Sequence, residues 1–290
     1  MSRVDQIFIE KAREIMTSGA SERDLNQQVR PIWDDGNAKE SAYTKYVTQQ
    51  VVEYKEGEVP ITNLRRIAWK TAIKELLWIY KDRCNNVNNL KKNYNVNYWD
   101  SWANEEGSLG TAYGYQTAKR FLSPETGQYV NQVERLIDQL KNNPLNRRLI
   151  ISLYDVDDLA EMTLIPCAFM TLWTVRGEYL DMTLIQRSGD FLAAAGPGGI
   201  NSFQYYVLLR MVAQVTGYKA GKFVHFVQNL HIYDRHTEIV QEVMAEDASK
   251  KGPSLILNPD IKNFDDFSID DFKLEGYDPS MKKYDIPIAI

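Results

Sequence analysis

The stretch from 164 to 190 reads LIPCAFMTLWTVRGEYLDMTLIQRSGD and combines two strand-like runs with a cysteine and an arginine at their ends. The runs cover Phe169 to Val175 and Tyr179 to Gln186, and their β-branched and aromatic residues favour strands. Cys167 stands just before the first run, and Arg187 stands just after the second. A thiol near a guanidinium suits the binding and covalent attack of an anionic molecule.

Further side chains near and beyond this stretch suit a nucleotide. Arg187 and Ser188 can hold a phosphate, because a guanidinium offers a fork of donors to oxyanions. Asn201 both donates and accepts, so it can pair with the adjacent carbonyl and N–H of uracil, whereas an aspartate would suit a cytosine edge. His231 and Tyr233 alternate on a strand-like segment and therefore face one side, where they can share a sugar hydroxyl.

Each of these side chains also has a purely structural interpretation. Cys167 alone reads as a small buried hydrophobe, and Asn201 can cap the helix that follows it. Glu75 can lie on the solvent face of its helix, and Arg147 and Arg148 can be a solvated pair. The tryptophans can be core residues, as aromatic residues usually are. The pattern as a whole, rather than any one residue, favours a nucleotide site.

Composition narrows the class of protein. The 290 residues are 44% hydrophobic and 25% charged, which is enough for one large domain or two small ones. A net charge of −5 argues against a general nucleic-acid binder, because there is no basic excess to neutralise phosphates. Only two cysteines occur, Cys84 and Cys167, and no apolar run approaches membrane-spanning length. We expect a cytoplasmic protein with no membrane segment and no bound DNA.

The three histidines predict no metal site, because they lack carboxylates or cysteines at the usual ligand spacing. His225 and His236 lack the context of His231, and we expect them to be structural or surface residues.

Hydrophobic periodicity predicts a single α+β domain over residues 1–290, with a mixed, mostly antiparallel sheet and packed helices. We expect Asn63 to cap a long helix over residues 65–80, and Gly217 to end a helix over residues 203–216. Residues 30–40 look like a loop. The expected helices are 4–18, 65–80, 130–142 and 203–216, and the further expected strands are 43–54, 149–154 and 223–229.

These residues, in this order, resemble the thymidylate synthase family. The resemblance runs from about Arg30 to Ile290. Within this range the detailed sequence is similar to the branch of the family found in some Gram-positive bacteria and their phages. No single sequence motif identifies the family, but the order in which the motifs occur together is highly specific. The further blocks that carry it are Ala72-Ile73-Lys74-Glu75-Leu76-Leu77-Trp78, Tyr98-Trp99-Asp100-Ser101-Trp102, Tyr113-Gly114, Asn146-Arg147-Arg148 and Pro287-Ile288-Ala289-Ile290.

The resemblance implies conversion of dUMP and the cosubstrate methylenetetrahydrofolate into dTMP and dihydrofolate, by covalent cysteine catalysis and without a metal. The catalytic residues it implies are Cys167, Glu75, Arg187, Asn201, Tyr113 and Asp190. The dUMP-binding residues it implies are Arg30, Arg147, Arg148, Gln186, Arg187, Ser188, Asp190, Asn201, His231 and Tyr233. The folate-binding residues it implies are Glu75, Trp99, Trp102, Asp190 and Ile290.

The resemblance also implies a homodimer formed through the sheet. Arg30 would hold phosphate within its own subunit, whereas Arg147 and Arg148 would reach into the site of the partner. The C-terminal segment, 287–290, would close over the folate as a lid that excludes water.

The chain departs from the commonest family pattern in three places. Residues 191–200 form a longer, glycine-rich loop; Gln228-Asn229 replaces the common Gly-Asp; and Ala168 replaces the histidine that usually follows the cysteine. These departures leave a phage-type dUMP hydroxymethylase as an alternative, although Trp99 and the apolar C-terminus favour the synthase by shielding the intermediate from water. An inactive relative that only binds nucleotide or RNA is a third hypothesis.

Overall fold

The computed structural model describes residues 2–25, 28–29, 31–36, 38–247 and 251–290. The helices within these residues are α1 Arg3–Ser18, α2 Trp69–Leu76, α3 Val87–Tyr94, α4 Gly114–Ala118, α5 Gln132–Asn142, α6 Ile200–Thr216 and α7 Thr237–Ala245. The strands are β1 Ala20–Ser21, β2 Ile32–Asp34, β3 Lys39–Ser41, β4 Thr44–Tyr54, β5 Phe121–Leu122, β6 Tyr129–Val130, β7 Ile150–Ser152, β8 Ala168–Arg176, β9 Tyr179–Gln186, β10 Gly189–Asp190, β11 Lys219–Tyr233, β12 Ser254–Leu257 and β13 Phe272–Glu275.

One large sheet organises these elements. Its order over the described residues is β1-β4-β11-β9-β8-β7, and the short strand β10 pairs with β11. β11 runs parallel to β9 and β10, and every other neighbouring pair in this sheet is antiparallel. The predicted mixed, mostly antiparallel sheet is therefore confirmed.

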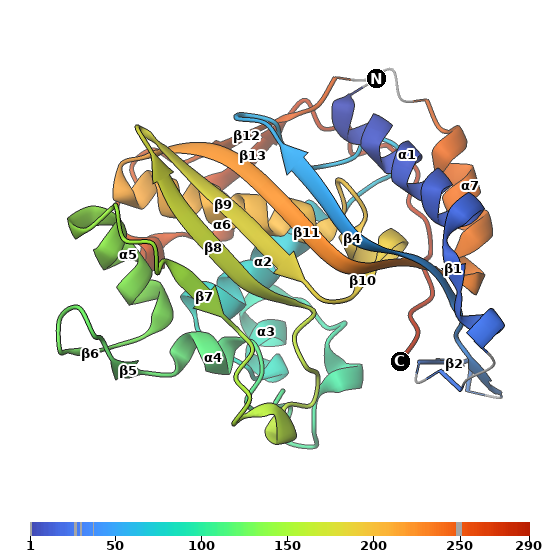
Figure 1. Ribbon diagram of the computed structural model, residues 1–290, viewed down its shortest axis with the longest axis horizontal. Coiled ribbons are helices and arrows are strands. Elements are labelled where there is room, and N and C mark those ends of the chain that lie inside the picture. The colour runs from blue at the N-terminus through green and yellow to red at the C-terminus, as the bar shows by residue number, and fades with distance from the viewer. Residues whose placement is uncertain (1, 26–27, 30, 37, 248–250) are drawn as a thin grey trace.

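Helices cover one face of the sheet. Figure 1 shows α6 and α2 behind the sheet, while β8, β9 and β11 lie open toward the viewer. α6 is buried over most of its circumference, from Ser202 to Val215, as expected for a helix between a sheet and further helices. Burial alternates residue by residue along β9, with Leu180, Met182 and Leu184 fully enclosed. The opposite side chains of β9 are only half-buried, so the open face is available to a second surface.

A second core lies at the end of the sheet that α1 and α7 cover. Phe8 and Ile15 of α1 and Val240 of α7 pack there with Phe191, which follows β10. The rings of Phe8 and Phe191 lie 4.7 Å apart between centroids. This core fixes the end of β10, which carries one of the candidate site residues.

Two local predictions are wrong. Asn63 does not cap the second helix, which begins at Trp69, because the amide of Asn63 bonds the buried carboxylate of Asp5 instead. The expected loop at 30–40 contains the antiparallel strands β2 and β3, which pair Trp33 with Glu40. The other predicted helices and strands lie within a few residues of their predicted ranges, whereas α3, α4 and α7 were not predicted. Gly217 ends α6 in the left-handed conformation, with φ 82°.

The C-terminal residue pairs with β2. Ile290 N donates to the oxygen of Ile32 at 3.0 Å, and Ile32 N donates to the oxygen of Ile290 at 2.9 Å. Figure 1 shows the C-terminus beside β2, below the end of the sheet. The last segment of the chain is thus tied down by two backbone hydrogen bonds.

Candidate active site

The register of β8 and β9 brings the predicted thiol and cation together. Ala168 lies opposite Gln186, so the residues just outside this pair also face each other. Arg187 N donates to the oxygen of Cys167 at 2.9 Å. The Arg187 guanidinium lies 3.6 Å from Cys167 Sγ and also donates to the main-chain oxygens of Ile165 and Pro166. Cys167 is partly exposed, and the Arg187 side chain reaches the surface.

Burial raises the pKa of the Cys167 thiol, and the charge of Arg187 opposes that rise. The guanidinium therefore acts in the predicted direction, but desolvation is the larger effect. The thiol form of Cys167 is therefore favoured at neutral pH.

Gln186, the last residue of β9, contacts two other predicted site residues. Its Nε2 atom donates to the main-chain oxygen of Ser188 at 2.9 Å and to Asn201 Oδ1 at 3.2 Å. Asn201 is the second residue of α6 and is partly exposed. The cap of α6 is Gly199, so the interpretation of Asn201 as a helix cap is wrong. Because the side chain is partly exposed, the Asn201 amide can face a ligand while it keeps its bond with Gln186.

The parallel pairing of β10 with β11 sets Asp190 beside His231. Asp190 Oδ1 accepts from the backbone N–H groups of Leu192 and Ala193, each at 3.0 Å. The helical turn Phe191–Ala195, which replaces the first half of the loop expected at residues 191–200, is capped by this carboxylate. Despite its burial, hydrogen bonds and nearby histidines lower the pKa of Asp190.

His231 and Tyr233 lie together, as their alternation predicts. Their rings meet edge to face at 5.1 Å between centroids. His231 Nδ1 lies 2.8 Å from Asn229 Oδ1, and burial lowers the pKa of His231. Burial raises the pKa of Tyr233. Both rings are therefore neutral at pH 7, which suits hydrogen bonding to a hydroxyl.

Glu75 is buried in α2 and is surrounded by donors. Its Oε2 atom accepts from Trp99 Nε1 at 2.8 Å and from the hydroxyl of Tyr98. Its Oε1 atom accepts from Gln204 Nε2 at 2.9 Å. The interpretation of Glu75 as a solvent-facing charge is wrong, because the side chain points into the protein and is 7% exposed. Three donors fix the carboxylate in one position.

Trp99 links this carboxylate to Tyr113. The rings of Trp99 and Tyr113 lie 5.0 Å apart, and that of Trp102 lies 5.7 Å from Trp99. Burial raises the pKa of Tyr113, and the nearby Cys167 raises it further. Tyr113 has φ 50° and ψ −104°, a conformation that non-glycine residues rarely adopt and that often marks a functional site.

The arginines expected to hold phosphate are not all part of this cluster. Arg147 and Arg148 are exposed before β7, and within the described residues neither guanidinium forms an ion pair. Arg30 lies outside the described residues.

Three residues near the site were not predicted from the sequence. Tyr98 and Gln204 bind Glu75 directly. His236 is fully buried, with Nδ1 at 3.4 Å from Asp190, so the suggestion of a surface residue is wrong. The spacing of Asn201 and Gln204 by one helical turn was the available signal for Gln204.

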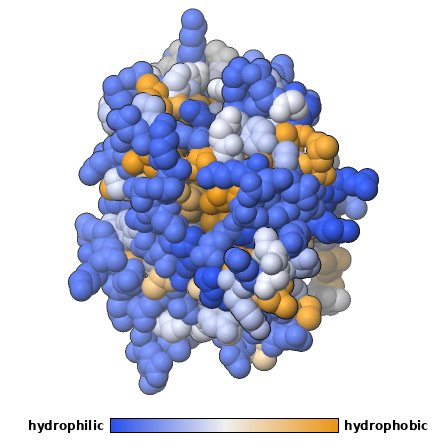
Figure 2. Space-filling view, turned by 90° about the vertical axis from the view of Figure 1, so that its left-hand side faces the viewer, coloured by the Kyte–Doolittle hydropathy of each residue, from blue (hydrophilic) through white to orange (hydrophobic). Residues whose placement is uncertain are grey.

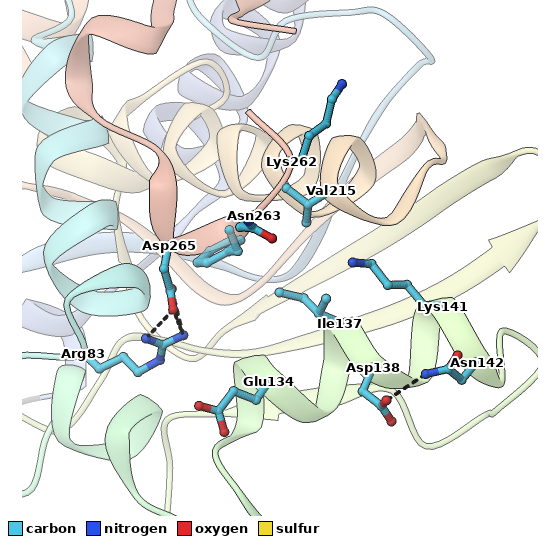
Figure 3. A pocket seen from close by; sticks show the side chains of 11 residues that line it. Arg83, Glu134, Ile137, Asp138, Lys141, Asn142, Val215, Lys262, Asn263 and Asp265 are labelled. Carbon is cyan, nitrogen blue, oxygen red and sulfur yellow. Dashed lines mark hydrogen bonds and ion pairs between the residues drawn. The ribbon is translucent and has the colours of Figure 1, made fainter. Parts of the chain in front are cut away.

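A separate groove of about 340 Å³ lies beside α5. Figure 2 views this side of the molecule, which is mainly hydrophilic with small apolar patches. Figure 3 shows α5 as one wall, with the ion pair of Arg83 and Asp265 at 2.9 Å closing one end. The described residues that line the groove include none of the predicted site residues: they are Arg83, Glu134, Ile137, Asp138, Lys141, Asn142, Val215, Lys262, Asn263, Phe264 and Asp265.

Among the described residues, no group of three or more His, Cys, Asp or Glu side chains is placed to hold a metal ion. None of the helices in the same part of the chain is both long and apolar enough to cross a membrane.

Comparison with known proteins identifies relatives over the whole chain. A family profile described as thymidylate synthase matches residues 6–290. A thymidylate synthase of Streptococcus pneumoniae (strain 70585) is 42% identical, with 100% of both chains covered. Thymidylate synthase 1 of Bacillus spizizenii is 40% identical, with 96% of each covered. The solved structure of thermostable thymidylate synthase A from Bacillus subtilis has a TM-score of 0.91 at 38% identity, covering 100% of both chains.

Proposed function

The chain belongs to the thymidylate synthase family, and from this premise we propose how its residues convert dUMP and methylenetetrahydrofolate into dTMP and dihydrofolate. The observation that carries the proposal is the 3.6 Å contact between Arg187 and Cys167 Sγ at the meeting point of β8 and β9. This contact supports a role for the Arg187 cation in stabilising the thiolate and in binding the anion.

Cys167 is the nucleophile. Its thiolate adds to the uracil carbon that is β to a carbonyl, and the ring electrons move to the neighbouring carbon and the carbonyl oxygen. That neighbouring carbon is then nucleophilic toward a one-carbon unit. After this carbon has bonded to the methylene group of methylenetetrahydrofolate, it loses its proton, and the bond between the methylene group and the folate nitrogen breaks. A hydride from the folate then completes the methyl group and leaves dihydrofolate, while the ring electrons expel the sulfur of Cys167. Release of Cys167 restores the ring and the free thiol.

Asn201 reads the base, and Glu75 and Tyr113 serve the proton transfers beside it. An amide pairs with the adjacent carbonyl and N–H of uracil. Glu75, fixed by Tyr98, Trp99 and Gln204, organises water and proton transfer at the ring. Tyr113 serves the carbon that loses its proton, a role supported by its packing against Trp99, which binds Glu75.

The remaining site residues bind the ends of the two substrates. Arg187, Ser188 and Arg30 bind the phosphate, and His231 and Tyr233 share the sugar hydroxyl. The aromatic surfaces of Trp99 and Trp102 and the carboxylate of Asp190 suit the flat, donor-rich ring system of folate. Ile290 belongs to the segment that closes over it.

The enzyme works as a homodimer that is formed through the open face of the sheet. Arg147 and Arg148 complete the phosphate site of the partner subunit. Their exposure and their lack of an ion pair within the described residues support this role. Residues 1–290 act as one catalytic domain. We place the enzyme in the cytoplasm, because its nucleophilic thiol must stay reduced.

Nothing in the relatives favours the hydroxymethylase alternative, and Trp99 is buried beside Glu75, where it keeps water from the intermediate. Purified protein incubated with dUMP and methylenetetrahydrofolate should form dihydrofolate and dTMP in equal amounts, followed by absorbance and mass spectrometry. Hydroxymethyl-dUMP without dihydrofolate would refute the proposed function.

A further inference from the structure

A buried chain of hydrogen bonds leads from the core to Asn201. Tyr54 of β4 donates to Ser202 Oγ at 3.2 Å, and Ser202 Oγ lies 3.0 Å from His225 Nδ1. His225 Nε2 lies 2.9 Å from Gln186 Oε1. Gln186 then donates to Asn201. Tyr54, Ser202, His225 and Gln186 are each at most 2% exposed, so water does not compete for the three bonds that join them.

The donor and acceptor of every hydrogen bond in this series follow from one fixed acceptor. The main-chain oxygen of Ser188 can only accept, so the atom of Gln186 beside it must be Nε2. Oε1 of Gln186 therefore faces His225, whose Nε2 must carry the ring proton. His225 Nδ1 then accepts from the hydroxyl of Ser202, which in turn accepts from Tyr54. No bond in the chain contradicts this order.

Burial lowers the pKa of His225 to about 3, so the ring is neutral at working pH and has a single N–H. A neutral ring has two tautomers, and only one agrees with the surrounding bonds. The tautomer with the proton on Nδ1 would set two acceptors, His225 Nε2 and Gln186 Oε1, against each other.

The last bond of the chain sets the orientation of the base-reading amide. The second N–H of Gln186 points at Asn201, so the Asn201 atom that it meets must be Oδ1. In this orientation Oδ1 can also accept from the uracil N–H, and Nδ2 can donate to the neighbouring carbonyl. Cytosine presents an acceptor and an amino group in those places, so it requires the amide turned by half a rotation.

We propose that His225 is a positioning residue for base selection, which through Gln186 holds the Asn201 amide in the orientation that accepts uracil and rejects cytosine. This inference rests on the proposed function, in which Asn201 reads the base. Turning Asn201 would cost its bond with Gln186, and turning Gln186 would set its amino group against His225 and its oxygen against Ser188.

Two substitutions separate this role from a packing role. In His225→Gln, the new amide reaches the former place of Nε2 and can donate to Gln186. In His225→Asn, the amide reaches only the former place of Nδ1, so it pairs with Ser202 and leaves Gln186 without a donor. The readout is the ratio of kcat/KM for dUMP to that for dCMP, with thermal unfolding as a check that each variant is folded.

The ratio should fall by about tenfold or more in His225→Asn, the effect of one ordinary hydrogen bond, and stay within about twofold of the parent in His225→Gln. An unchanged ratio in His225→Asn, or an equal loss in both variants, overturns the inference. A parent enzyme without dUMP turnover overturns the proposed function, and is detected before any variant is made.

One measurement needs no variant and no substrate. Nitrogen NMR of the imidazole in the unmodified protein should show the Nε2–H tautomer for His225. It should also show no titration of this ring between about pH 5 and 9, given its lowered pKa. A ring with the proton on Nδ1 overturns the inference even if the variants fail to fold.

Discussion

The buried ring of His236 holds the C-terminal segment, because its Nε2 atom lies 2.7 Å from the main-chain oxygen of Pro287. The other ring nitrogen faces Asp190 at 3.4 Å. One side chain therefore touches both the segment proposed to close over folate and a carboxylate proposed to bind it. The position of that segment and the charge of Asp190 are linked through a titratable group.

Replacing His236 with phenylalanine should lower the melting temperature by about 3 °C. The loss should be larger at low pH than at high pH. Burial opposes protonation, but Asp190, the main-chain oxygen of Pro287 and the charge of Asp234 together raise the pKa of His236 above 6.5. The charged ring thus stabilises the folded protein fully below pH 6.5, and this contribution is lost as pH rises through the raised pKa. Melting curves of parent and variant from pH 5.5 to 8.5 test this. Asp190→Asn should remove the pH-dependent part, and a deficit that grows with pH would contradict the prediction.

Cys167→Ser should abolish covalent capture of fluoro-dUMP in the presence of folate. Fluorine blocks the later proton removal, so the parent protein should accumulate a covalent adduct that mass spectrometry detects. Cys84→Ser is the matched control and should keep the adduct, because Cys84 lies against the backbone of Asn86. An undiminished adduct in Cys167→Ser would move the nucleophile to Cys84.

Asn201→Asp should shift preference from dUMP toward dCMP. An ionised carboxylate accepts from the cytosine amino group but cannot donate to the uracil carbonyl. Leaving that carbonyl unpaired should weaken the binding free energy of dUMP by roughly 1–3 kcal/mol. Binding constants for both nucleotides test the shift. If the variant binds both as the parent does, Asn201 does not read the base.

Two inactive variants should complement each other in a mixed dimer. Cys167→Ala lacks the nucleophile, and Arg147→Ala/Arg148→Ala lacks the arginines offered to the partner. A hybrid dimer holds one complete site, so equal mixing with full exchange should restore about one quarter of the parental activity. Activity after subunit exchange is the measurement. No rescue despite proven exchange, or a fully active monomer in sedimentation, would contradict the shared site.

The sequence predicts best those elements whose signals are local. The alternating run of β9 was predicted with the bounds that the structure has, Tyr179–Gln186, because both its pattern and its ends are visible in the chain. The start of α2 was not predicted correctly, because Asn63 is bound by Asp5, a partner in a different helix. Propensity cannot report a competitor that is distant in sequence.

The candidate site also combines contacts that local sequence signals predict with contacts that they do not predict. The contact of Cys167 with Arg187 follows from two neighbouring strands, and so it could be expected from their spacing. The contact of His236 with Pro287 joins segments that no local pattern relates. The roles of Arg147 and Arg148 depend on a second chain, so neither the sequence pattern nor one subunit settles them.

The pairing of β4 with β11 has a consequence for biosynthesis. Residues 44–54 leave the ribosome early, whereas their partner, residues 219–233, is among the last long elements to be made. At usual rates of translation the gap lasts on the order of 10 s or more. During that time residues 44–54 lack their partner in β11, and a strand edge that stays unpaired can pair with a neighbouring polypeptide. A ribosome that pauses within this interval therefore presents an aggregation-prone intermediate, and slower initiation, which spaces nascent chains apart, should raise the yield of folded enzyme.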